Sequence, residues 1–473
     1  MHLFSVALLL LLAWSALAFG GSPTWAAAAT LVLAVATGIL GVLESSPSSP
    51  DRAARKPTHG RLLLAVGLVL VAVSFQLIPF PEDLTRRLSP ARAEADYEEI
   101  LANKNLQDLA YLDRRPGDPV PISIVPARTL LGLSGLAGLA VLLFGASRGL
   151  STIGVRTSTR SVATIGVVVT LILLYQLTIG QRLIYGWYVP LFADGRSAPF
   201  INPNHDAGWL VMAMSLSLGA FAGEIASGQR GSPSWRDRVI WLSTPEGSVA
   251  LLLLFASACM AIGVLATRAR SGALAMILAF AGLAWWNNRK QPTQRRRLST
   301  AAVIAVVGLG VLAFNGAEVL TELVATKDTA GRIEIWRDTL RIANDFRLSG
   351  TGYNTYGAAM LHHQTVKGTT HFIEAHNEYL QLAAEGGLLL CIPFLILGLT
   401  LALEIRRRFH EQADDSRTYW IRVGAVTGII AMALQSLVEF TLQMPGGAVM
   451  FTTLLAIAIH RPPARQARRR EAA

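Results

Sequence analysis

Charged residues are scarce in this chain. Asp, Glu, Lys and Arg make up 15% of the 473 residues, whereas a soluble domain carries about 25%. Apolar and aromatic residues supply 52% of the sequence, and the mean hydropathy is +0.43. These values exclude a soluble enzyme and a disordered chain, and they predict an all-α polytopic membrane protein.

Cysteine is also nearly missing. The two cysteines, Cys259 and Cys391, both lie inside apolar runs, which excludes a disulfide scaffold. The sequence shows neither the Cys/His spacing of a zinc site nor a paired-carboxylate metal motif. We therefore predict no metal ligands and no cofactor.

Long apolar runs dominate what is present. A bilayer core of about 30 Å requires roughly 20 apolar residues in a helix. Twelve segments meet or approach this length: 3–19, 25–43, 62–78, 129–145, 162–179, 207–222, 249–266, 273–286, 301–314, 388–403, 423–437 and 446–459. The first could also be a cleavable signal peptide, but no Lys or Arg precedes its apolar core, which favours an uncleaved helix.

Loop charges predict the orientation. The net charge is +11, and with both termini in the cytoplasm the inner segments hold 25 of the 42 Lys and Arg residues. The arginine triplets at 295–297, 406–408 and 468–470 all fall inside. This positive-inside pattern explains most of the basicity without nucleic acid as a partner.

The spans divide the chain into four parts. Residues 1–316 hold nine spans and an outer insertion at about 81–127, and 317–378 form a second long outer loop. Residues 379–460 hold the last three spans, and 461–473 form a basic inner tail. Loops as long as these two are usually functional or internally ordered.

The second outer loop contains a predicted amphipathic helix. Four apolar residues recur at helical spacing and three arginines occupy the polar faces, namely Ile333, Trp336, Leu340 and Ala343 with Arg332, Arg337 and Arg341. We expect this helix to lie on the outer membrane face. The Ser349–Thr355 segment is a predicted turn, because Gly350 and Gly352 permit positive φ or close backbone approach.

Polar side chains also precede the tenth span. In a helix, Asn377, Gln381 and Glu385 form a stripe with His376 beside it. A carboxylate near the membrane boundary is costly unless it is paired or hydrated, which makes Glu385 a functional candidate. Capping of helices, or pairing between them, explains the same residues equally well.

Two arginines occupy a very short outer turn between spans. Arg268 and Arg270 lie on the side that the charge rule leaves poor in cations. An anionic ligand would compensate, because the planar guanidinium fits phosphate oxygens. Pairing with lipid headgroups or with outer acidic residues is the alternative.

A further polar cluster precedes the sixth span. Asn204 and His205 follow Pro203 and can hydrogen-bond a sugar or a phosphate, although an N-cap formed by Asn202 or Asn204 is equally compatible. Arg182 and Arg196 flank the preceding outer loop, and Glu439 and Gln443 flank the last outer turn. All these clusters map to one side, which predicts a site at the outer interface.

At these residues the chain resembles the O-antigen ligase superfamily, with its polymerase relatives. The matching pieces appear in the family order over about 200–460: Asn202-Pro203-Asn204-His205, Arg270-Ser271-Gly272, Gly331-Arg332 through Trp336, Gly350-x-Gly352, and His376-Asn377-x-Tyr379-Leu380-Gln381 ending in Glu385-Gly386-Gly387. Leu390, where ligases often carry Gly, Thr or Tyr, and Arg268, where a smaller residue is commoner, depart from the family pattern.

The resemblance implies a GT-C-like membrane glycosyltransferase in the bacterial inner membrane. Such an enzyme would move a glycan from undecaprenyl diphosphate to an acceptor hydroxyl, with inversion and without metal, at the periplasmic face. The partners would be the lipid-linked glycan, an acceptor glycan or lipid A–core, and membrane lipids. Ligase, polymerase and protein O-oligosaccharyltransferase remain open, and a transporter is the rival from another class.

The resemblance also implies residue roles. Arg270 and Arg332 would neutralise the leaving diphosphate, with Arg268 and Arg182 as weaker candidates. His376 would act as the base or orient the diphosphate. The remaining candidates would bind or position substrate: Asn204, His205, Asn377, Gln381 and Glu385.

Overall fold

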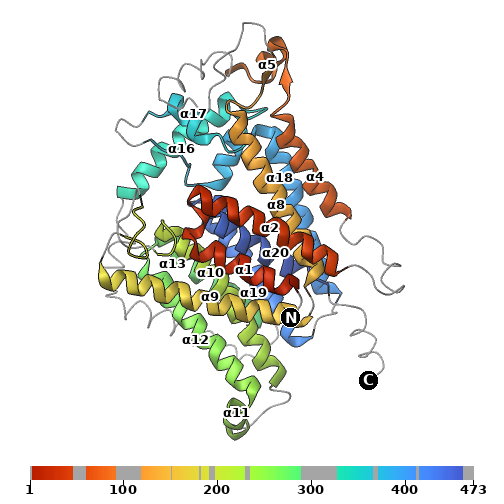
Figure 1. Cartoon of the computed structure of the whole chain (residues 1–473), viewed down its shortest axis with the longest axis vertical. Coiled ribbons are helices and arrows are strands. Elements are labelled where there is room, and N and C mark those ends of the chain that lie inside the picture. The colour runs from red at the N-terminus through yellow and green to blue at the C-terminus, as the bar shows by residue number, and fades with distance from the viewer. Residues whose placement is uncertain are drawn as a thin grey trace.

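The chain is built almost entirely of helices (Figure 1). The computed structural model describes residues 3–45, 60–91, 119–150, 152–180, 183–190, 198–228, 235–288, 327–365, 371–411 and 415–461. Its longer helices are α1 (Leu3–Leu17), α2 (Thr24–Glu44), α4 (Gly60–Phe75), α8 (Pro126–Gly149), α9 (Thr152–Ile179), α10 (Pro203–Gly228), α12 (Pro245–Ala266), α13 (Arg270–Asn288), α16 (Lys327–Asp345), α18 (Glu378–His410), α19 (Ser416–Gln435) and α20 (Pro445–Ile459).

Shorter elements connect these helices. They are α5 (Glu82–Leu88), α11 (Trp235–Leu242), α17 (Tyr356–His363) and the 3-10 turns η1 (Phe19–Gly21) and η3 (Thr441–Gln443). One antiparallel strand pair joins β1 (Pro79–Phe80) to β2 (Val120–Pro121). The structure therefore agrees with the all-α prediction.

Eleven of the twelve predicted apolar segments coincide with a helix, and the twelfth, 301–314, lies outside the described residues. Within the described part, six helices are long and apolar enough to cross a membrane, namely α2, α8, α9, α10, α12 and α18, and four shorter helices are also apolar, namely α1, α4, α13 and α20. A polytopic membrane protein is thus supported, and the count of twelve spans stays a prediction.

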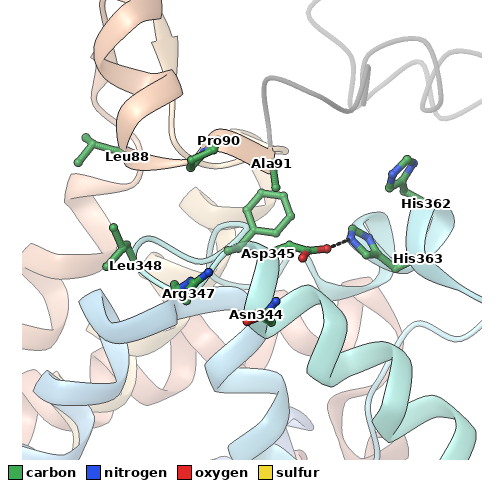
Figure 2. Close-up of a pocket in the computed structure, with 10 residues that line it drawn as sticks. Leu88, Pro90, Ala91, Asn344, Asp345, Arg347, Leu348, His362 and His363 are labelled. Carbon is green, nitrogen blue, oxygen red and sulfur yellow. Dashed lines mark hydrogen bonds and ion pairs between the residues drawn. The ribbon is translucent and has the colours of Figure 1, made fainter.

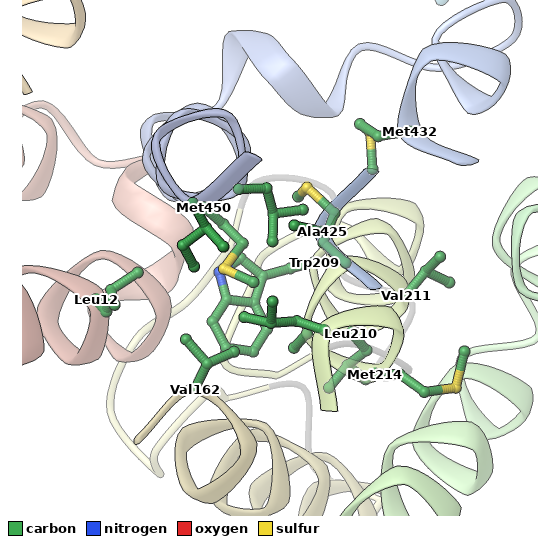
Figure 3. Packing of buried hydrophobic residues seen from close by; sticks show 14 of the residues in the cluster. Leu12, Val162, Trp209, Leu210, Val211, Met214, Ala425, Met432 and Met450 are labelled. Carbon is green, nitrogen blue, oxygen red and sulfur yellow. The ribbon is translucent and has the colours of Figure 1, made fainter. Parts of the chain in front are cut away.

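Helix α10 forms the centre of the bundle. Its side chains are buried along most of its length, and Trp209 packs there among residues of α1, α9, α19 and α20 (Figure 3). Helices α10 and α19 approach so closely that a Cβ atom on Gly424 would lie 2.5 Å from the Ser215 carbonyl oxygen. Small residues at such crossings allow the backbone contact that drives helix association in lipid.

One end of the bundle collects the predicted outer segments. Helices α10, α13, α18 and α20 begin there, and α12 and α19 end there. Helices α5, α16 and α17 lie at the top of Figure 1, and α11, from a predicted inner segment, lies at the bottom. The predicted outer loops thus gather on the side where the candidate site residues lie.

Helix α18 is broken at Gly387, where φ is +51°. The predicted turn enters this break: the Thr351 amide donates to the Ala384 carbonyl oxygen and the Gly352 amide to that of Glu385. Gly350 and Gly352 have φ values of +68° and +111°, which confirms that the turn needs glycine. The Thr351 and Gly352 amides thus hold the turn against α18.

Helix α16 forms as predicted, but its buried face differs. Ile333 and Leu340 are exposed, whereas Asp338 and Thr339 are fully buried. Asp338 accepts hydrogen bonds from Thr365, and the Thr339 hydroxyl bonds the hydroxyl of Tyr356 in α17. These bonds offset the cost of burying polar groups, so α17 and Thr365 cover two polar residues of α16 that the apolar periodicity did not mark as buried.

Candidate active site

The Glu439 carboxylate is the centre of the candidate site. It is fully buried and lies in the short connection between α19 and η3. Its Oε1 atom accepts a hydrogen bond from Arg332 Nη2 at 2.6 Å and lies 3.5 Å from Ser271 Oγ. Its Oε2 atom lies 3.6 Å from His376 Nδ1. One buried carboxylate thus joins α13, α16 and the segment before α18.

Arg332 and His376 are both partly open. Their side chains keep 26% and 27% of their exposure, so each can meet a ligand while it contacts Glu439. Arg332 also donates from Nη1 to the Val438 carbonyl oxygen at 3.0 Å. The charge of Arg332 is therefore fixed beside the imidazole by two bonds to one short segment.

Arg270 is the first residue of α13, directly before Ser271. It is half-buried, whereas Arg268 is exposed and has a left-handed φ of +54°. As predicted, Arg268 lies in the three-residue connection between α12 and α13, and Arg270 lies at its edge. The contact between Ser271 and Glu439 brings this turn to the cluster around Arg332 and His376.

His205 reaches the same cluster from α10. Its ring meets Phe440 edge-on with centroids 4.6 Å apart, and His376 meets Phe440 in the same way at 4.8 Å. The His205 Nε2 atom is buried, and among the described residues it has no hydrogen-bond partner. Asn204 lies beside it, and its carbonyl oxygen accepts from Gln435 at 3.3 Å. The expected N-cap bond is made by Asn202, whose Oδ1 accepts from the Asn204 amide.

The stripe on α18 forms as predicted, and its polar atoms are engaged within the protein. Asn377 caps the helix by accepting from the Tyr379 and Leu380 amides. Glu385 accepts from the Asn354 amide at 2.8 Å and the Tyr356 amide at 3.0 Å.

Gln381 connects the polar groups around this stripe. Its amide nitrogen donates to Glu374 Oε2 at 2.7 Å and to Gln443 Oε1 at 3.0 Å, and it lies 3.3 Å from Glu385 Oε1. Direct substrate contact by Asn377, Gln381 or Glu385 stays a prediction, and the bonds present show that all three order the segment around His376.

Electrostatics differ between the Glu439 and Glu374 carboxyl groups. Burial alone would raise the pKa of the Glu439 carboxyl group, but His376 and Arg332 hold that pKa below its ordinary value. Burial raises the pKa of the half-buried Glu374 carboxyl group to about 8, although its bond from Gln381 acts in the opposite direction. Glu439 is therefore ionised at neutral pH, and Glu374 is largely protonated.

The structure brings most of the predicted site residues to one end of the bundle. Arg332, His376 and His205 contact Glu439 or its neighbour Phe440, and Arg270 adjoins Ser271. Arg182 lies outside the described residues. The central position of Glu439 was not predicted. The available signal was a carboxylate in a short connection between two apolar runs.

A cavity of about 760 Å³ lies apart from this cluster. Figure 2 shows it between the Leu88–Ala91 segment and helices α16 and α17, lined by polar residues that include Arg347, His362 and His363. Its lining does not include Arg332, His376 or Glu439. In the part of the chain that the structure describes, no group of three or more His, Cys, Asp or Glu side chains could hold a metal ion.

The central part of the chain is similar to a known protein family. Residues 255–395 match the family model described as O-antigen ligase, and curated proteins give no match. The matched segment runs from α12 into α18 and contains Arg270, Arg332 and His376, whereas Glu439 lies beyond it. The match confirms the family resemblance and supports a membrane enzyme of the O-antigen ligase or polymerase type.

Proposed function

We propose that this protein, whose residues 255–395 match the O-antigen ligase family model, moves a glycan from undecaprenyl diphosphate to an acceptor hydroxyl at the periplasmic face of the bacterial inner membrane. The observation that carries the proposal is the contact of Arg332 and His376 with one buried carboxylate, at the end of the bundle to which the loop charges assign the outside. The product would be a cell-surface polysaccharide.

The arginines would bind the leaving group. A lipid diphosphate gains negative charge as the glycosidic bond to its oxygen breaks, and fixed cations stabilise that charge without reorganising. Arg332 is held in place by Glu439 and Val438, and Arg270 begins α13 beside the same cluster. With Arg268 and Arg182 as further candidates, these side chains would supply the positive charge that a metal ion supplies in other transferases.

His376 would take the proton of the acceptor hydroxyl. An imidazole has an ordinary pKa near neutral pH and can act as a general base there. Its partly exposed ring lies within the same cluster as Arg332, so His376 would meet the attacking oxygen on one face of the anomeric carbon while Arg332 meets the diphosphate that leaves from the opposite face. An attack opposite the leaving group inverts the anomeric centre.

Arrangement of the buried charged groups favours an enzyme over a transporter. Transporters place ionisable groups and broken helices near the bilayer midplane. In α10, the buried Asp206 and Glu224 lie near opposite ends of the helix. The break in α18 at Gly387 lies within its first three turns and is filled by the Ser349–Gly352 turn.

Turnover of a defined substrate tests the proposal. Purified protein is incubated with an undecaprenyl diphosphate oligosaccharide and either lipid A–core or a second lipid-linked oligosaccharide, with and without chelator. We expect a glycosylated product with inverted anomeric configuration, unaffected by chelator. Lipid A–core as acceptor would indicate a ligase, and the lipid-linked acceptor a polymerase.

A matched pair of variants connects the activity to the cluster. We expect Arg332→Ala to lose transfer, and Arg337→Ala, which removes an exposed arginine from the same helix, to retain it. Folded wild-type protein that transfers glycan to neither of these acceptors, nor to a Ser/Thr peptide, would overturn the proposal.

A further inference from the structure

The two oxygens of Glu439 have different tasks. Oε1 accepts from Arg332 at 2.6 Å, which uses one face of the carboxylate for the guanidinium. Oε2 faces His376 Nδ1 at 3.6 Å, and among the described residues neither of these two buried atoms has a hydrogen-bond partner. A small movement would make this pair a hydrogen bond. The carboxylate oxygen can only accept, so the bond requires that Nδ1 carries the hydrogen.

The backbone around His376 is fixed on both sides. His376 has a left-handed φ of +50°, which a non-glycine residue adopts only when its surroundings hold it there. The Ala375 amide donates to Gln381 Oε1, and the Ala375 carbonyl oxygen accepts from the Trp336 indole at 3.0 Å. Asn377 caps α18 on the other side. The ring is thus aimed at Glu439 by the chain itself.

We infer that Glu439 is a positioning residue for the transfer reaction: its carboxylate holds the proton on His376 Nδ1, so that Nε2 is the atom that accepts the proton of the acceptor hydroxyl. This inference rests on the proposed function. The inference goes beyond the proposed function because Glu439 lies outside the segment that matches the ligase family.

The reaction balances with these groups alone. The acceptor oxygen forms a bond to the anomeric carbon while its O–H bond breaks, and that proton passes to His376 Nε2. The bond from the anomeric carbon to the phosphate oxygen breaks, and its electron pair stays on the diphosphate. The imidazolium then faces the Glu439 carboxylate, which stabilises it, and it later returns the proton to water.

Other charges around the imidazole act against protonation. The charged groups are Arg332, which lies on the same carboxylate, and Arg270, which adjoins Ser271; the third neighbour, the buried His205 ring on Phe440, adds no fixed charge. The negative charge of Glu439 balances the positive charge of Arg332. Proton uptake by His376 therefore makes the local cluster cationic just as the diphosphate becomes more anionic. Removal of the Glu439 charge leaves the cations without this balance and disfavours the imidazolium.

The test is the pH profile of kcat/KM for Glu439→Gln and Glu439→Asp, measured in detergent with a lipid-linked oligosaccharide and a defined acceptor. We expect Glu439→Gln to lower kcat at least about tenfold and to shift the rising limb of the profile about one pH unit downward. KM for the donor should not rise, because the diphosphate meets one negative charge fewer. Glu439→Asp keeps the charge and should restore the position of the limb.

Asp338→Asn is the matched control, because Asp338 is an equally buried carboxylate on the helix that carries Arg332 and bonds Thr365 instead of the cluster. We expect its profile to keep the wild-type limb. A Glu439→Gln protein that folds with wild-type kcat and an unmoved limb would overturn the inference while wild-type turnover upholds the proposed function. Absence of turnover in folded wild-type protein would instead overturn the proposed function.

Discussion

Buried or half-buried arginines occur at both ends of this bundle, and they are used differently. At the end predicted to face the cytoplasm, Arg422 is 1% exposed and donates to the His460 and Ile457 carbonyl oxygens at the end of α20. Arg408 is 3% exposed and bonds the Ile459 carbonyl oxygen and nearby glutamates. At the opposite end, where the candidate site lies, the Arg332 side chain keeps 26% of its exposure beside a histidine.

The difference separates arginines with a structural role from an arginine that can take part in the reaction. An arginine whose donors meet the last carbonyl oxygens of a helix satisfies groups that the helix leaves unpaired, and it contributes stability. An arginine that shares a buried carboxylate with an imidazole, and that remains open on one side, can still bind an anion. Each variant below changes a residue at one end of the bundle. A change at the candidate site should affect transfer or its local pH dependence, and a change at the opposite end should affect stability.

His376→Ala should have the largest effect on activity. Loss of a general base removes about 10²- to 10⁴-fold of rate, whereas the fold should persist because the ring is only partly buried. Glycan transfer per folded molecule measures the loss, and size-exclusion profiles in detergent confirm the fold. If this variant and Arg270→Ala both insert normally and still support polysaccharide assembly in a deletion strain, the enzyme hypothesis fails.

Arg422→Gln should show the reverse behaviour. It removes a charged donor from buried α20 carbonyl oxygens, which should cost about 3 kcal/mol of stability. Thermal unfolding in detergent should occur at a lower temperature, while turnover per folded molecule stays unchanged. An unchanged unfolding temperature would remove the contrast between the two ends.

Arg270→Lys should give a smaller loss. A lysine keeps the charge but cannot form the two parallel bonds of a guanidinium to phosphate oxygens. We expect transfer to fall about tenfold with stability unaltered, mostly through weaker stabilisation of the leaving diphosphate. Near-full activity in this variant would show that Arg270 does not contact the diphosphate.

Glu374→Gln should have the smallest effect, on the pH dependence of stability. Burial raises the pKa of Glu374 to about 8, so the folded state binds a proton that the unfolded state releases between about pH 4.5 and 8. This contribution to wild-type stability should therefore be greatest at the acidic end of this window and decline as pH rises to 8. The variant should lack this component, as thermal unfolding at several pH values would show; an identical slope in both proteins would refute it.

Much of the fold could be predicted because apolar runs determine where spanning helices form. Eleven of the twelve predicted segments lie on helices, and loop charges alone placed the polar clusters on one side. The buried face of α16 could not be predicted, because Asp338 and Thr339 are satisfied by Thr365 and Tyr356 from another helix and its loop. The spacing of apolar residues indicates which face of a helix is hydrophobic, and it does not show which polar side chains will be buried with hydrogen-bond partners.

The candidate site was predicted residue by residue but without its centre. Arg332 and His376 were expected to lie together, yet the residue between them, Glu439, is 107 positions from Arg332 and 63 from His376. Glu385 was expected to bind or position substrate, which stays a prediction, and its oxygens accept the backbone amides of Asn354 and Tyr356. The sequence showed Glu439 beside the last outer turn but not its partners, and the partners of Glu385 depend on where the kink in α18 meets the Ser349–Gly352 turn.

Sidedness of labelling tests the central claim most directly. Single cysteines replace exposed residues near the cluster, Arg268 and Ile373, and at the opposite end, Arg407, in a background where Cys259 and Cys391 are serine. With a membrane-impermeant thiol reagent on intact spheroplasts, we predict that positions 268 and 373 are labelled and that position 407 is labelled only after lysis. Labelling of 268 and 373 from opposite sides of the membrane would contradict the account.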